Sequence, residues 1–283
     1  MRWDAKRIEL YQLGAQWYAD AARQEAARTE VMASRPSDTT GRPQAAQGGE
    51  DRLTEFLQGV SLNRAIPLRD QIYALVRKAI VTGKLAPGAP INEIEIANKL
   101  GISRTPVREA VKKVSDEGLI EVFAQNGTFV ADISRKQVEE AYIIRIALEL
   151  ESIKRAAVVI ETRHIQDLED IINAHETAVK RGRFDEAITR DDDFHRYIAE
   201  VNGLAMLWKV VDVSKAQMDR CRLLSLPSPG AGQETIAQHR AILAALAKRD
   251  QAGSMKALQT HLETSLRNTI FLLDAEPASL LTS

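Results

Sequence analysis

Four side chains in the second half of the sequence have the types and spacing that could hold a divalent metal ion. Asp191 and His195 stand four residues apart, so on a helix they share one face. His239 and His261 are flanked by apolar residues of two later helical segments, so side chains from three helices could converge inside a bundle. One carboxylate and three imidazoles suit zinc, nickel or manganese and leave coordination positions for water or an anionic ligand. The alternative is an Asp-His surface pair with two core histidines.

A second candidate site is a stripe of cations on one predicted helix. Arg104, Arg108 and Lys112 are spaced four apart and form a stripe beside the apolar side of the helix, which includes Val107 and Val114. A guanidinium can read guanine edges bidentately in the major groove of DNA, while an ammonium group suits phosphates. The alternative is that these cations only solvate the outer face of a surface helix.

The elements around the stripe decide between these two interpretations. Apolar periodicity predicts three helices, near residues 68–83, 91–100 and 103–117, with Gly101 at the corner between the second and the third. Two β-prone runs, 119–123 and 128–131, then surround the Asn126-Gly127 pair, which is a strong hairpin signal. This order is that of a winged helix-turn-helix, in which the third helix enters the major groove and the hairpin can reach the minor groove. The hydroxyls of Ser103 and Thr105, at the start of that helix, suit phosphates.

The metal candidates require a different domain, because strand signals disappear beyond Ser134. We expect six helices near residues 135–160, 162–181, 184–201, 204–225, 230–248 and 250–273. The predicted fold class is therefore mainly α, with a winged helix-turn-helix over 63–132 and an all-helical bundle over 134–276. Residues 1–62 are predicted to be an extension and flexible linker, since 33–50 are rich in Ser, Pro, Thr, Gly and Gln.

Composition limits the class of protein. The chain has 283 residues, 45% apolar and 27% charged, which is typical of globular domains, and a formal net charge of -1. A DNA-binding surface must therefore be local; residues 67–131 hold nine Lys or Arg against seven acids. The one cysteine, Cys221, excludes a disulfide framework and indicates a buried thiol in a reducing cytoplasm. Because no membrane-length apolar run or secretory signal is visible, we expect a cytoplasmic protein without a membrane partner.

Several strings of the first domain resemble the DNA-binding domain of the GntR family. They are Pro67-Leu68-Arg69, the run from Ile80 to Gly88, the run from Leu100 to Ala110, and Glu117-Gly118-Leu119-Ile120. The resemblance implies that Arg104 and Arg108, with the hydroxyls around them and the wing glycine, contact operator DNA. Some members also use an Arg where this sequence has Ile94. The predicted DNA-binding residues are Arg69, Ser103, Arg104, Thr105, Pro106, Arg108, Lys112, Asn126 and Gly127.

Residues 134 to about 275 resemble the FCD effector domain of GntR regulators, in its shorter, six-helix VanR-like branch. Many FCD domains bind a divalent metal through an Asp, a His four residues later and two His on the last two helices. The resemblance implies these roles for Asp191, His195, His239 and His261.

The resemblance also places an Arg near the effector pocket, on the first helix of the FCD domain. Arg145 matches this position and could bind a ligand carboxylate; the alternative is an i,i+4 pair with Glu149. His164 and His175 match no ligand position, so we expect them to be surface or packing residues.

Both resemblances together predict a homodimeric transcription regulator, a repressor, that binds double-stranded operator DNA. A small carboxylate effector, bound near the divalent metal, would control its affinity for the operator. One alternative is a metal-dependent hydrolase in which the Asp and His residues activate water. Another is an architectural DNA-binding protein without a ligand.

Overall fold

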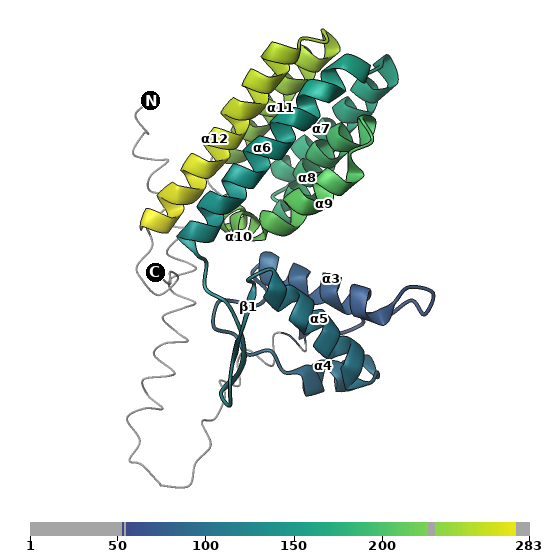
Figure 1. Ribbon diagram of the computed structural model, residues 1–283, viewed down its shortest axis with the longest axis vertical. Helices are drawn as coiled ribbons and strands as arrows, with labels where there is room; N and C mark the ends of the chain where they lie inside the picture. Colours follow the sequence, from purple (N-terminus) through teal and green to yellow (C-terminus); the bar gives the residue numbers. More distant parts are fainter. Residues whose placement is uncertain (1–52, 54, 226–229, 276–283) are drawn as a thin grey trace. The chain divides into compact units, whose positions relative to one another are not determined.

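The computed structural model describes residues 53, 55–225 and 230–275. They form two compact units divided between Ile133 and Ser134 (Figure 1). The predictions for residues 1–52, including the linker over 33–50, lie outside the described residues.

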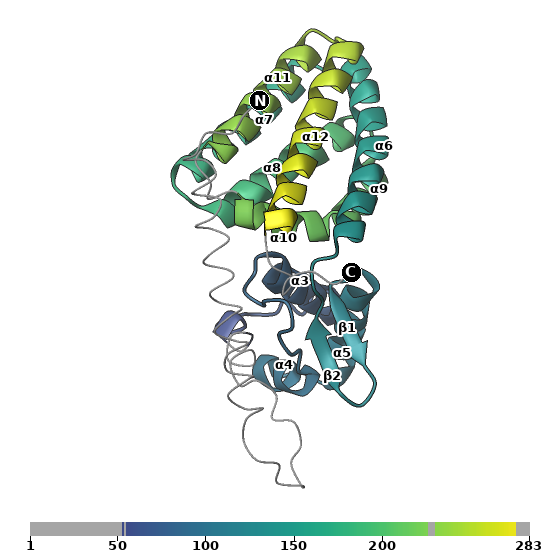
Figure 2. The ribbon, with the colours of Figure 1, turned by 90° about the vertical axis from the view of Figure 1, so that its left-hand side faces the viewer.

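The first unit contains three helices and a hairpin in the predicted order. The helices are α3 (Leu68–Val81), α4 (Glu93–Leu100) and α5 (Arg104–Asp116), and the strands are β1 (Ile120–Phe123) and β2 (Gly127–Val130). Figure 2 shows the hairpin beside these helices. Apolar side chains at helical spacing, such as Ile72 and Val76 of α3 and Val107 and Val111 of α5, are buried in the shared core.

The corner between α4 and α5 follows from local chemistry. The Asn92 side chain caps α4 by accepting hydrogen bonds from the backbone amides of Ile94 and Glu95, at 3.0 and 3.2 Å. Gly101 ends α4 in the left-handed conformation, with φ of 64°, which a residue without a Cβ adopts at little cost. As predicted, this glycine lets the chain turn directly into α5.

The hairpin forms, but its turn differs from the predicted Asn-Gly pair. Phe123 pairs with Gly127, so the loop is residues 124–126 and the left-handed position belongs to Gln125, with φ of 67°. The register of β2 is also held from its other edge, because the amide of Ile91 donates to the carbonyl of Thr128 at 2.8 Å. Gly127 is therefore a strand residue at the base of the loop.

The second unit is all-helical. Its helices are α6 (Arg135–Val159), α7 (Thr162–Lys180), α8 (Phe184–Val201), α9 (Ala205–Ser214), α10 (Ala216–Ser225), α11 (Ala231–Ala247) and α12 (Gln251–Ala275). The long helices α6 and α12 run side by side (Figure 1), and α7 packs against α8 and α11. The core between them includes Ile153, Leu168, Ile172, Phe194 and Leu258. None of the described helices has the length and hydropathy of a membrane span.

The prediction of six helices in this unit is wrong, because the segment 204–225 is two helices, α9 and α10. They separate at Lys215. The carbonyl of Val211 accepts both the hydroxyl of Ser214, at 2.9 Å, and the amide of Lys215, at 3.0 Å. Lys215 itself is buried and pairs with acidic residues inside the unit. Apolar periodicity could not predict that the Lys215 ammonium group is buried among acidic partners.

Candidate metal centre and DNA-binding helix

The structure brings the four predicted metal-ligand candidates together inside the helical unit. Asp191 and His195 come from consecutive turns of α8, His239 from α11 and His261 from α12. All four are buried, and each offers one ligand atom such that these atoms lie within 4.8 Å of one another. The alternative of a surface Asp-His pair is wrong, because neither side chain of that pair is more than 1% exposed.

The Nε2 atoms of the three histidines face one another and the carboxylate. His195 Nε2 lies 3.2 Å from His261 Nε2, and His239 Nε2 lies 3.4 Å from Asp191 Oδ1. The ring of Phe194 stacks on His239, with centroids 4.2 Å apart and an interplanar angle of 16°. Packing thus fixes the His239 ring with Nε2 toward the cluster.

Outer partners orient two of the imidazoles from behind. His195 Nδ1 lies 2.7 Å from Glu149 Oε2, and His261 Nδ1 donates to Gln238 Oε1 at 2.9 Å. Glu149 Oε1 accepts a further bond from Arg145 Nε at 2.7 Å. A histidine whose Nδ1 proton is held by an oxygen presents an unprotonated Nε2, which is the arrangement that metal ligands use. Glu149 and Gln238 were not among the predicted site residues.

Burial and neighbouring charges place these groups in the protonation states that a metal requires. Burial alone would raise the pKa of Asp191, but Arg222 and the histidines outweigh it and hold that pKa well below its usual range. Burial lowers the pKa of His261 to about 3 and that of His239 well below its ordinary value. Metal binding requires an ionised carboxylate and neutral imidazoles, so no proton has to be displaced from these three groups near pH 7.

Two of the candidate ligand atoms lack a hydrogen-bond partner among the described residues. Within the described residues, Asp191 Oδ1 and His239 Nε2 are buried and make no hydrogen bond. A buried polar atom without a partner costs about 1–3 kcal/mol, which coordination to a cation would offset. Zinc ligands lie about 2.0–2.2 Å from the ion, so ligand atoms of one site are up to about 4 Å apart. The cluster fits a divalent metal after a small contraction.

The predicted effector residue, Arg145, lies behind the cluster. Its side chain is buried on α6 and makes the i,i+4 ion pair with Glu149, so that pairing alternative is what the structure contains. On another side of the cluster, a small solvent-open hollow is bordered by α10, α11 and α12. Its lining includes Arg222, Gln238 and His261. Sequence patterns gave no signal for Arg222, because an arginine in an amphipathic helix is normally solvated.

The remaining histidines and the cysteine are not part of the ligand group. His175 is buried, with its ring centroid 5.5 Å from that of His239, and burial lowers its pKa to about 4. His164 accepts a bond from the backbone amide of Glu161 at 3.1 Å, at the start of α7. Both observations agree with packing or surface roles. Burial raises the pKa of Cys221 to about 12, as befits the predicted buried thiol.

On α5, the predicted cationic stripe is exposed and the apolar side is buried. Arg104 and Lys112 are exposed, and the Arg108 side chain is 69% exposed, while Val107 and Val114 are in the core. The only described ion pair of the stripe joins Arg108 Nε to Glu93 Oε2 at 3.5 Å. These cations are thus available to a large anionic partner.

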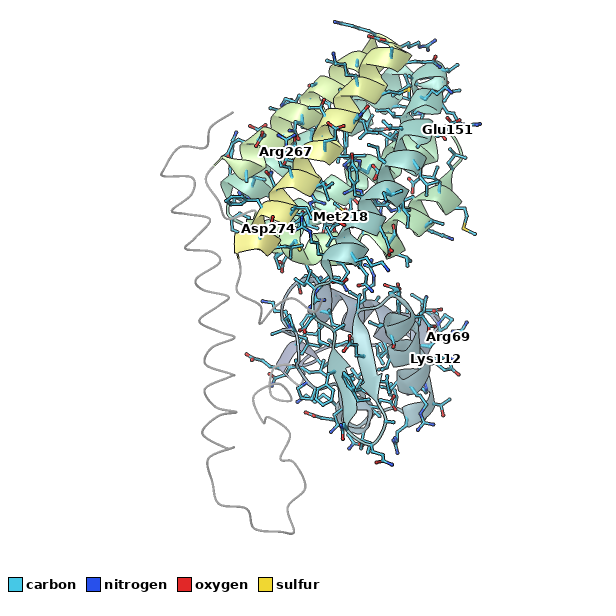
Figure 3. All side chains as sticks on the ribbon, turned by 60° about the vertical axis from the view of Figure 1, so that its left-hand side comes forward. Arg69, Lys112, Glu151, Met218, Arg267 and Asp274 are labelled. Carbon is cyan, nitrogen blue, oxygen red and sulfur yellow. The ribbon has the colours of Figure 1, made fainter. Side chains whose placement is uncertain are left out.

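The other predicted DNA-binding residues surround this stripe. Arg69 of α3 is 62% exposed, and Figure 3 shows Arg69 and Lys112 on the same side of the unit, both reaching outward. Ser103 is the N-cap residue of α5 and makes no side-chain capping bond. The set is completed by Thr105, Asn126 and Gly127, which are exposed, and Pro106, which is half-buried.

Lys113 differs from its neighbour Lys112, because it faces α3. Its Nζ lies 3.8 Å from the ring centroid of Tyr73 and 3.9 Å from Asp70 Oδ1. Tyr73 bonds to Glu117 just beyond the end of α5, and Arg77 Nε donates to the same carboxylate at 2.9 Å. The two bonds to Glu117 hold α5 on α3 and so set the direction of the exposed stripe.

Comparison with known proteins decides what this pair of units is. The sequence model for bacterial regulatory proteins of the gntR family matches residues 68–130, and the FCD domain matches residues 140–264. The chain is 34% identical over 202 residues to the HTH-type transcriptional repressor RspR of Escherichia coli K12, covering 71% of this chain and 89% of RspR. The chain belongs to the GntR family. It is a DNA-binding transcriptional regulator with an FCD domain, and the family and its relatives are not enzymes, so the hydrolase alternative is set aside.

The solved structures agree on the fold. E. coli McbR/YncC has a TM-score of 0.64 at 23% identity, covering 74% of this chain and 99% of that chain. A GntR regulator from Rhodococcus sp. RHA1 has a TM-score of 0.59 at 21% identity, covering 74% and 99%. These likenesses confirm the predicted fold class. The VanR-like branch stays a prediction.

Proposed function

We propose that this GntR regulator is a homodimeric repressor whose operator affinity is controlled by a small carboxylate effector beside a divalent metal. Asp191, His195, His239 and His261 would hold the ion. The observation that carries the proposal is the buried group of four ligand atoms within 4.8 Å, with its histidines oriented from behind. RspR, to which the chain is similar, is itself named a repressor.

The metal, when bound, supplies positive charge that attracts a carboxylate and leaves coordination positions for its oxygens. Zinc, nickel and manganese all suit one carboxylate and three imidazoles. The chain orients the ligand group through Glu149 and Gln238, and burial lowers the pKa of His239 and His261 so that these two imidazoles are neutral. Arg145 uses Nε on Glu149, and its remaining guanidinium donors suit the effector carboxylate.

On the DNA side, Arg104 and Arg108 would read base edges in the major groove, because they are exposed on the first two turns of α5. Lys112, with the hydroxyls of Ser103 and Thr105, would bind phosphates. The remaining contacts are assigned to Arg69, Pro106, Asn126 and Gly127. Two copies on a pseudo-palindrome would double the contacts, as helix-turn-helix dimers do.

The first test is a DNase footprint on the intergenic DNA beside the protein's own gene, at stated salt. A protected inverted repeat is expected for a dimer that binds two half-sites. Protection of a single unrepeated site, or none, would contradict the dimeric operator reading.

The metal site is tested by calorimetry with Zn²⁺ on the full chain and on an His239→Ala, His261→Ala variant. The wild type should bind about one ion per chain and the variant none, since half of the ligand group is removed. A variant that still binds zinc stoichiometrically would refute this ligand set. Carboxylates that change operator affinity only in the metal-loaded protein would identify the effector.

A further inference from the structure

A buried arginine forms an ion pair with Asp191, one of the proposed metal ligands. Arg222 of α10 places its Nη2 2.7 Å from Asp191 Oδ2, and its side chain is only 10% exposed. The approach is made by a helix other than those that carry the ligand group, which come from α8, α11 and α12. Asp191 therefore has a counter-charge inside the protein without any ion.

Arg222 is one link in a buried series of alternating charges. Its Nη1 lies 3.5 Å from Asp219 Oδ1, and Asp219 also pairs with Lys215. Lys215 Nζ in turn lies 2.8 Å from Asp192 Oδ2, next to the ligand Asp191 on α8. Since Lys215 marks the separation of α9 and α10, this series connects the proposed metal site to the break between these helices.

A guanidinium and a divalent cation that approach the same carboxylate repel each other. Buried charges are screened little by solvent, so the repulsion between them is much larger than at a surface. Arg222 lies 2.7 Å from Asp191 Oδ2, and the same carboxylate would offer an oxygen to the proposed ion. The pair and the metal are therefore alternative ways of neutralising one carboxylate.

The Arg222 side chain borders a hollow toward which it can turn. Arg222 lines the solvent-open hollow together with His261, Gln238 and polar residues of α12. A guanidinium that leaves Asp191 can turn toward this hollow while Asp219 holds its other edge. An anion in the hollow would favour that position.

We propose that Arg222 is an exchangeable counter-cation: it neutralises Asp191 in the metal-free protein and gives up this contact when a divalent metal binds. This inference rests on the proposed metal site and adds its regulation. Metal binding then requires Arg222 and α10 to adjust, and an anion that holds Arg222 in the hollow strengthens metal binding. By linkage, the metal strengthens binding of that anion by the same factor.

The test is zinc affinity of the full chain, measured by competition with a chromophoric chelator, for the wild type, Arg222→Gln and Arg222→Lys. Removing the competing cation should tighten zinc binding at least tenfold in Arg222→Gln. Arg222→Lys keeps the charge and should stay within about threefold of the wild type, since an ammonium also competes for Asp191. Arg220→Gln is the matched control, because Arg220 is a buried arginine on the same helix that donates to the neutral Gln217 at 3.0 Å.

A second readout is the melting temperature without metal, which Arg222→Gln should lower because Asp191 loses its buried counter-charge. If this variant is unfolded without metal, zinc should restore its circular dichroism spectrum, since the ion replaces the missing charge. Failure of zinc to restore it would overturn the inference, as would zinc binding that is equal to or weaker than that of the wild type. Absence of zinc binding in every variant, wild type included, would instead refute the metal site itself.

Discussion

The two units treat charge in opposite ways. On α5, Arg104, Arg108 and Lys112 are exposed, and the closest described counter-charge to any of them is Glu93, 3.5 Å from Arg108. In the helical unit, Asp191 is fully buried and has an arginine at 2.7 Å. Cations on a DNA-binding surface can stay solvated in the free protein, because the phosphates of the bound DNA neutralise them. A buried carboxylate such as Asp191 needs a counter-charge from the protein itself as long as no metal ion is bound.

The largest effect should come from removing the exposed charges of α5. We expect the Arg104→Ala, Arg108→Ala variant to lose about 2–6 kcal/mol of specific binding, since each bidentate contact to a base contributes about 1–3 kcal/mol. Fluorescence anisotropy on the footprinted operator, at fixed salt, measures this loss. Lys113→Ala is the control on the same helix, because its ammonium lies over the Tyr73 ring and should change affinity little.

Operator affinity that survives the double substitution would show that α5 is not the recognition helix. A comparable loss in Lys113→Ala would show that the effect comes from general charge reduction, and the contrast between the two faces of α5 would be lost.

In the helical unit, the next largest effect should come from breaking the contact between Glu149 and His195. Glu149→Gln should weaken zinc binding about 10- to 100-fold, the usual cost of removing an outer partner of a metal-bound histidine. Calorimetry measures the change. Glu151→Gln is the matched control two residues along α6, where the carboxylate pairs with Arg155 at 2.7 Å and is half exposed; Figure 3 shows its position. Equal affinities for these two variants would mean that Glu149 has no part in orienting His195.

The sequence predicted these two sites unequally. The stripe on α5 could be derived from helical periodicity, because one helix alone sets three cations at spacing four and the apolar face beside them. The metal group required the family resemblance, since it joins α8, α11 and α12, and no spacing in the sequence states that they meet. Arg222 and Gln238 were missed for the same reason.

Two local errors have a similar physical origin. Periodicity predicted one helix over 204–225, but α9 and α10 meet at Lys215, whose buried ammonium pairs with acidic residues of other turns and of α8. The Asn126-Gly127 pair indicated the hairpin correctly, but Gly127 joins β2, which residues 88–91 also hydrogen-bond, so the loop is one residue shorter than predicted. In both places tertiary contacts overrode a local preference.

A smaller change should separate base reading from phosphate binding within the exposed stripe. Lys112→Ala is expected to weaken binding by a similar factor on all DNA sequences, because an ammonium on a phosphate carries no sequence information. Its slope of log affinity against log salt should fall by about 1, as one fewer phosphate is neutralised. Anisotropy titrations at four salt concentrations, on operator and on scrambled DNA, measure both. A loss confined to the operator would assign Lys112 to base reading.

The smallest effect is expected from Glu93, which pairs with the stripe among the residues that the structure describes. Glu93 sits 3.5 Å from Arg108, and exposed ion pairs contribute only about 0.2–1 kcal/mol. Glu93→Gln should therefore raise operator affinity by no more than about fivefold, by freeing Arg108 and removing a charge that repels phosphates. Glu109→Gln removes an exposed acid of α5 and reports the repulsion alone.

Repeating both substitutions in an Arg108→Ala background separates the two causes. Suppose that the ion pair with Glu93 restrains Arg108 from reading DNA. The gain in operator affinity from Glu93→Gln should then shrink to that from Glu109→Gln once Arg108 is absent. If operator affinity falls in Glu93→Gln with Arg108 present, the carboxylate holds the guanidinium in its reading position. The exposed stripe would then need internal orientation by an acid, as the buried imidazoles do, and the two units would differ only in solvation.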